Sequence, residues 1–88
     1  MKIKDGFVLR SVMGNNVVIA VGEASKNFRG MVQLNESASD IWGYIADGKS
    51  RDEICDLMLD KYEVERAALE ADVDHVIGVL CDNGLIEL

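Results

Sequence analysis

The sequence changes character at the boundary between Leu34 and Asn35. Before this boundary, short apolar, β-branched runs are separated by glycines, which is typical of strands and turns. After it, apolar residues recur at the i, i+3, i+4, i+7 spacing of amphipathic helices. A chain of 88 residues has room for one small domain. Strands and helices must therefore share one core, and the pattern predicts a single α+β domain over residues 1–88.

The first part predicts a hairpin and a short third strand. Two β-rich runs, residues 7–13 and 16–21, flank Gly14-Asn15, which suits a two-residue type II′ turn because glycine accepts a positive φ. With Val12 opposite Val17, one hairpin face is almost entirely β-branched, and we expect it to pack on the core. That face carries Val8, Val12, Val17, Ile19 and Val21. After a loop over residues 22–30, residues 30–34 predict the third strand.

The second part predicts three helices. Asn35 is a favourable N-cap for a first helix that ends near Gly48, and Ser50 to Glu53 matches the capping box that starts a second. A third helix is expected from about Glu65 to Asn83. Trp42 continues the apolar stripe of the first helix, so we expect it in the core. The short link between helices one and two favours a winged helix-turn-helix domain: a three-stranded antiparallel sheet followed by three helices on one face.

Charge is divided unevenly between the two parts. Residues 1–34 hold five Lys or Arg against two acids, a net charge of +3, whereas residues 35–88 hold four against fourteen, a net charge of −10. A protein that binds DNA through a helix needs cations to neutralise phosphates. The acidic helical part therefore argues against nucleic acid as a partner.

The sequence offers little material for catalysis or metal binding. His75 is the only histidine, and we expect it on the exposed flank of the third helix. The aspartates Asp52, Asp56, Asp60, Asp72 and Asp74 alternate with apolar positions, as on a solvated helix face. Cys55 and Cys81 lie outside any CxxC or Cys/His cluster, which favours reduced core thiols. We expect no catalytic residue, no metal and no cofactor.

The longest apolar run, residues 17–21, is too short to cross a membrane. The first six residues lack the apolar stretch of a signal peptide. We therefore expect a cytoplasmic protein without a membrane partner.

A small three-stranded sheet has two edges, and a free edge can bind an extended peptide by strand addition. Residues 31–34 carry no charge that would repel such a strand. Two alternatives remain open from the pattern: the edge binds a peptide, or the loop over residues 22–30 covers it.

One specific block of the sequence is Gly30-Met31-Val32-Gln33-Leu34-Asn35-Glu36-Ser37, followed by Ile41-Trp42. Further characteristic segments are Lys2 to Arg10, Gly22-Glu23, Tyr62-Glu63-Val64, Ala71-Asp72-Val73 and Gly84-Leu85-Ile86. Through these residues the chain resembles, over nearly its whole length, the PqqD-like family, named after pyrroloquinoline quinone biosynthesis protein D. At Glu63-Val64-Glu65 the chain departs from the family, many of whose members have an aspartate that caps the third helix.

The resemblance implies a winged helix-turn-helix fold that recognises peptides. Such proteins bind the leader of a ribosomally made precursor peptide and deliver it to a modifying enzyme, often a radical S-adenosylmethionine enzyme. The leader adds to the third strand, which maps onto Met31, Val32, Gln33 and Leu34. It lies beside the third helix, where the resemblance implies Asp72, His75, Val76, Val79 and Asn83. A one-residue slip along this helix would substitute neighbours such as Leu80.

Two other functions are also consistent with the sequence. A winged-helix transcription regulator shares the fold, but its helix-turn-helix would have to bind DNA phosphates. The net charge of −10 on residues 35–88 opposes such binding. A purely structural subunit of an enzyme complex is the other rival.

Overall fold

The computed structural model describes residues 1–28 and 30–88. Along the chain the elements are β1 (Lys2–Ile3), β2 (Phe7–Val12), β3 (Asn15–Ala20), the 3-10 helix η1 (Gly22–Lys26), β4 (Met31–Leu34), α1 (Glu36–Ala46), α2 (Arg51–Lys61), α3 (Arg66–Asp82) and β5 (Ile86–Glu87). The predicted α+β class, with a three-stranded antiparallel sheet followed by three helices, is confirmed. Arg29, in the loop expected over residues 22–30, lies outside the described residues.

The strand order of the main sheet is β2-β3-β4, so β4 lies at an edge. The hairpin between β2 and β3 turns at Met13-Gly14, where both φ angles are positive (52° and 82°). This is the signature of a type I′ turn. The predicted turn at Gly14-Asn15 is therefore wrong by one residue, and Val12 lies opposite Asn15 rather than Val17.

The predicted core face of the hairpin is also wrong, except that Val17 is buried, at 4% exposed. Val8, Val17 and Ile19 do share a face, but the face that joins the main hydrophobic core is the other one. The strand residues packed in or against this core are Phe7, Leu9, Val18, Val32 and Leu34. These side chains are bulkier, and Phe7 makes an edge-to-face contact with Phe28 at 5.3 Å between ring centroids. The valine face also carries Arg10, which is exposed to solvent.

The helices begin and end where the sequence predicts. The Asn35 side chain accepts a hydrogen bond from the Ala38 amide, and Ser50 and Glu53 form a complete capping box. Gly48 adopts a φ of 82° just after α1, a conformation that favours glycine. Of the three α-helices, α3 alone lacks a side-chain N-cap, at Glu65, where the chain departs from the family.

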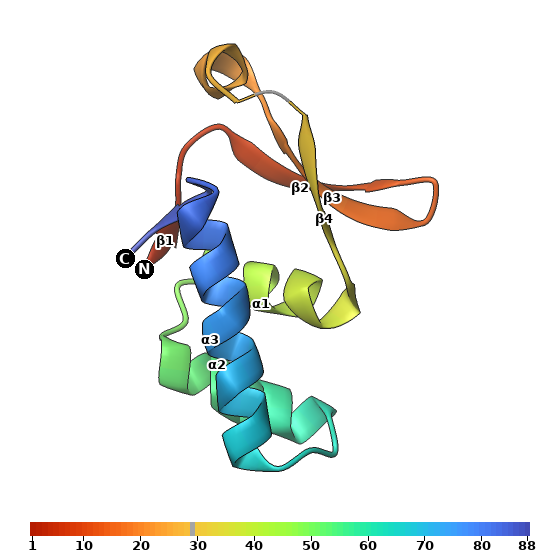
Figure 1. Ribbon diagram of the computed structural model, residues 1–88, viewed down its shortest axis with the longest axis vertical. Coiled ribbons are helices and arrows are strands. Elements are labelled where there is room, and N and C mark those ends of the chain that lie inside the picture. The colour runs from red at the N-terminus through yellow and green to blue at the C-terminus, as the bar shows by residue number, and fades with distance from the viewer. Residues whose placement is uncertain (29) are drawn as a thin grey trace.

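The sequence did not reveal a second, two-stranded sheet formed by β1 and β5. It brings the two termini together beside the C-terminal end of α3 (Figure 1). Leu85 and Ile86 are almost fully buried, so the C-terminal tail packs down as expected. Trp42 is 4% exposed and lies in the core, as predicted.

Candidate functional site

The free edge of β4 presents a defined set of backbone groups. The two-residue turn at Met13-Gly14 is closed by the hydrogen-bonded pair Val12 and Asn15, and hydrogen-bonded pairs then alternate with non-bonded pairs along the ladder. The alternation reaches Gly6, whose carbonyl accepts a hydrogen bond from the Val21 amide at 2.7 Å. Odd-numbered residues of β3 therefore bond to β2, and even-numbered residues bond to β4.

The register between β3 and β4 extends this alternation to the edge. Val18 pairs with Val32 and Asn16 pairs with Leu34, so the backbone groups of Val32 and Leu34 point into the sheet. Those of Met31 and Gln33 point outward. Each of these two residues offers one N–H donor and one C=O acceptor to an added strand.

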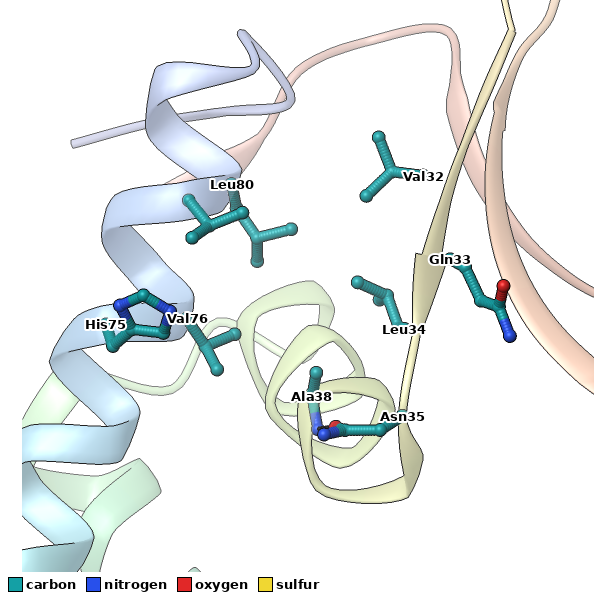
Figure 2. Close-up of a pocket in the computed structure, with 9 residues that line it drawn as sticks. Val32, Gln33, Leu34, Asn35, Ala38, His75, Val76 and Leu80 are labelled. Atoms are coloured by element: carbon teal, nitrogen blue, oxygen red, sulfur yellow. Dashed lines mark hydrogen bonds between the residues drawn. The ribbon is translucent and has the colours of Figure 1, made fainter.

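A groove of about 200 Å³ lies between this edge and α3. It is lined by Val32, Gln33, Leu34, Asn35, Ala38, His75, Val76, Val79 and Leu80. Figure 2 shows Val76 and Leu80 of α3 facing Val32 and Leu34 of β4 across this space, with Ala38 of α1 below. Most of the lining side chains are thus apolar, with Asn35 and His75 as exceptions, while the strand side supplies backbone hydrogen-bonding groups.

The structure brings together most of the residues that the resemblance implied. Val32, Gln33, Leu34, His75, Val76 and Val79 line the groove. Three others lie outside its lining. The Met31 side chain is 61% exposed and belongs to the opposite face of the sheet, Asp72 is exposed on α3, and the Asn83 amide donates to the Val79 carbonyl at 2.8 Å.

Gln33 contributes its backbone rather than its side chain. The side chain shares a face with Val17 and donates a hydrogen bond to the Asn15 side chain at 3.1 Å. Figure 2 shows it directed away from the groove.

The residues implied by the resemblance omit Asn35 and Ala38, and they include Leu80 only as the neighbour that a one-residue slip would substitute. Ala38 and Leu80 belong to apolar stripes that the sequence assigns to the core, and both are buried. Both also line the groove, Ala38 from α1 and Leu80 from α3, so they border the opening as well as belonging to the core. Asn35 directly follows β4 and caps α1. Its position next to the end of the strand is the sequence signal that could have identified it as a groove residue.

The other side of α3 is joined to α2 by ion pairs. Arg51 binds Asp74 in a bidentate pair with two distances of 2.8 Å, and it also contacts Glu70 at 3.2 Å. Arg66 contacts Asp56 at 3.0 Å and Glu70 at 3.3 Å. The hydrogen bonds from Arg51 lower the pKa of Asp74. Asp56 and Asp74 are therefore not simply solvated, as the sequence had suggested, but bind arginines.

A second polar cluster joins α1 to the end of α2. Asp40 accepts hydrogen bonds from Lys61 and from the Tyr62 hydroxyl, both at 2.8 Å. Burial alone would raise the pKa of Asp40, but these hydrogen bonds outweigh it and the pKa is lowered. The same hydrogen bonds raise the pKa of Lys61 and of Tyr62.

The described part of the chain also carries two free thiols. Cys55 is buried, which raises the pKa of its thiol, and Cys81 is half-buried; both are free thiols. Within residues 1–28 and 30–88, no three His, Cys, Asp or Glu side chains are placed to hold a metal ion. In that same part of the chain, no helix is long and apolar enough to cross a membrane. The groove can bind through apolar contacts and backbone hydrogen bonds.

Two solved structures resemble this fold closely. One, described as TbiB1 in complex with the TbiA(beta) leader peptide, is 26% identical with a TM-score of 0.81, over 99% of this chain and 95% of that chain. The other, lasso peptide synthetase B1 complexed with the leader peptide, is 23% identical with a TM-score of 0.77, over 96% of this chain and 93% of that chain.

The comparison with curated proteins gave no match. The profile of the PqqD family, described as coenzyme PQQ synthesis protein D, matches residues 17–86. This range covers most of β3, all of β4, the three α-helices and every residue of the groove. The chain therefore belongs to the PqqD family.

Proposed function

We propose that this protein is a non-catalytic adaptor that binds the leader of a ribosomally made precursor peptide. The leader adds to the sheet as a strand beside β4, and the adaptor presents it to a peptide-modifying enzyme. The observation that carries this proposal is the uncharged free edge of β4, whose outward backbone groups lie next to an apolar groove. Family membership supports it.

The structural neighbours support the same proposal to different degrees. TbiB1, at 26% identity over 99% of this chain, is described in complex with a leader peptide. Lasso peptide synthetase B1 falls below 25% identity, so its likeness supports only the fold.

In this proposal the peptide follows the register of β4. One peptide residue exchanges hydrogen bonds with Gln33, and the residue two positions away exchanges them with Met31. The peptide residues opposite Val32 and Leu34 then face the groove, because cross-strand partners share a face of the sheet. Apolar side chains at two alternate peptide positions would be buried against Val76, Val79 and Leu80.

The identity of the enzyme partner is the finer part of the proposal. We infer a radical S-adenosylmethionine enzyme or another peptide-modifying enzyme from the family resemblance. The adaptor itself supplies no cofactor or metal in this scheme. Its contribution is to hold the leader in one place and so raise the effective concentration of the attached peptide at the enzyme.

A DNA-binding role for the helical part of the chain is not favoured. Arg66 is the only Lys or Arg of α3, and it is engaged by Asp56 and Glu70. Arg51 of α2 is likewise engaged by acids on both helices. The cations that a DNA-binding helix would direct at phosphates are here used between the two helices.

The test uses peptides selected from a phage-displayed library of random linear sequences, followed by titration of a selected peptide with backbone amide NMR detection. Shifts concentrated on β4 and α3 support the proposal, whereas shifts concentrated on α1 and α2 would overturn it.

Two proline variants make the test specific for the edge. Gln33→Pro removes an outward N–H, so affinity should fall about tenfold while the fold is kept. Gln33→Ala is the matched control and should bind almost normally, because the side chain points away. Val32→Pro removes a hydrogen bond to β3 and should destabilise the domain instead. Undiminished binding by folded Gln33→Pro would contradict strand addition.

A further inference from the structure

The groove is lined by side chains of different length at its two ends. Near Leu34 it is closed from below by Ala38, whose side chain stops at Cβ. Opposite Val32, α3 contributes the longer side chain of Leu80. Figure 2 shows the Cβ of Ala38 pointing into the space between Leu34 and Val76. More room is thus left for a partner's side chain at the Leu34 end.

We propose, on the basis of the proposed function, that Ala38 determines the size of the peptide side chain that lies opposite Leu34. The preferred peptide carries a bulky apolar residue, such as leucine, methionine or phenylalanine, at this position. It carries a smaller apolar residue two positions away, opposite Val32. Ala38 is thereby a specificity-determining residue rather than only a core alanine.

The register supports this assignment. Leu34 directs its backbone groups to β3, so a peptide residue opposite it belongs to a non-hydrogen-bonded pair. In such pairs the Cα atoms are about 4.5 Å apart and the side chains lie close together. The peptide side chain therefore projects on the same face as Leu34, toward Ala38 and Val76.

The backbone of Ala38 does not restrict which side chain stands at this position. Its amide donates to the Asn35 side chain at 2.9 Å, a hydrogen bond that any residue except proline can make. Its side chain is 6% exposed and borders open space in the groove. A leucine at this position would extend into the groove and occupy the volume left for the peptide.

The experiment measures a series of synthetic peptides derived from one library-selected binder. Intermolecular NOEs to Leu34 identify the peptide residue opposite it, which is then varied among alanine, valine, leucine and phenylalanine. Wild-type protein should bind the leucine or phenylalanine peptide about tenfold or more tightly than the alanine peptide, because the larger side chain buries more apolar surface. In Ala38→Leu this preference should disappear or reverse.

Two further variants sharpen the test. Ala46→Leu makes the same change at an exposed position of the same helix outside the groove and should retain the wild-type preference. The double variant Ala38→Leu with Val79→Ala should shift the preferred bulky residue to the position opposite Val32. Val79 is 37% exposed, so its truncation removes little of the core.

The outcomes separate this proposal from the function on which it rests. If no selected peptide perturbs β4 and α3, the proposed function fails and the size proposal fails with it. If peptides bind at β4 but Ala38→Leu weakens every peptide of the series equally, Ala38 has only a structural role and the size proposal alone is overturned. An unchanged preference in folded Ala38→Leu overturns it as well.

Discussion

The two sides of α3 are stabilised in different ways. Toward α2, Arg51 and Arg66 join the two helices through pairs with Asp74, Asp56 and Glu70. Toward β4, no ion pair among the described residues crosses the gap, and an apolar groove remains open. The ion-paired side holds the helix in place, so the groove side can stay unpartnered. A groove formed in advance lowers the ordering cost of binding an extended peptide.

The largest expected effect comes from breaking the core that supports both sides. Trp42 is 4% exposed and packs within the same cluster as Val73 and Leu80 of α3. Trp42→Ala should lower the free energy of unfolding by about 3–5 kcal/mol, a large share of what so small a domain has. Urea denaturation followed by circular dichroism measures the loss. A variant with wild-type stability that no longer binds peptide would instead assign Trp42 to the binding surface.

The next effect should appear in binding and not in stability. Val79 lines the groove and is 37% exposed, so Val79→Asp places a charge where an apolar peptide side chain must lie. Affinity for a selected peptide should fall about tenfold or more, while the melting temperature changes little. Isothermal titration calorimetry with a thermal melt measures both quantities.

Val64→Asp is the matched control for this charge. Val64 is also an exposed valine, 49% accessible, and it lies outside the groove. The Val64→Asp variant should bind peptide like the wild type. Equal affinities for Val79→Asp and Val64→Asp would place the peptide away from this side of α3.

The sequence predicted the features that neighbouring residues determine. The Asn35 cap, the Gly48 stop and the Ser50 capping box are local hydrogen-bonding or φ requirements, and all were located correctly. The sheet was harder to predict. Alternation shows which residues share a face, but not which face the helices cover, and here the bulkier Phe7 and Leu9 face the core. The strands β1 and β5 have two residues each, too few for any pattern.

The groove shows a similar division. Its strand side follows from the uncharged run at Met31 to Leu34. Whether Val32 or Gln33 directs its backbone groups outward could be decided only from the registers of the β2–β3 and β3–β4 ladders. Ala38 and Leu80 were assigned to the core because a stripe cannot show that part of it borders an opening. The acidic helices suggested solvated faces, and only the fold pairs Arg51 with Asp74 across two helices.

A smaller effect is expected on the ion-paired side. Arg51→Met keeps the aliphatic stem but removes the hydrogen bonds to Asp74 and Glu70. The melting temperature should fall by a few degrees, and less at high salt, since exposed ion pairs are screened. Peptide affinity should stay within about twofold of wild type, because a change of that size corresponds to well under 1 kcal/mol. Arg10→Met, at a cation with no ion pair among the described residues, should leave the melting temperature unchanged. A large loss of peptide binding in Arg51→Met would show that the two sides of α3 are coupled.

The smallest effect concerns acid stability. Asp40 has a lowered pKa because Lys61 and Tyr62 donate hydrogen bonds to its carboxylate. A depressed pKa in the folded state stabilises the protein above the pKa of the unfolded state, and this stabilisation is lost as pH falls through the folded-state value. Asp40→Asn should therefore be less stable than wild type near neutral pH, and the difference should shrink in acid below the usual pKa of aspartate.

Asp60→Asn, at an exposed acid of α2 without a hydrogen bond among the described side chains, is the control and should follow the wild-type curve of stability against pH. A difference that stays constant from neutral pH into acid would mean that the variant loses packing rather than a charged hydrogen bond. Peptide affinity near neutral pH should not change, since this cluster lies outside the groove.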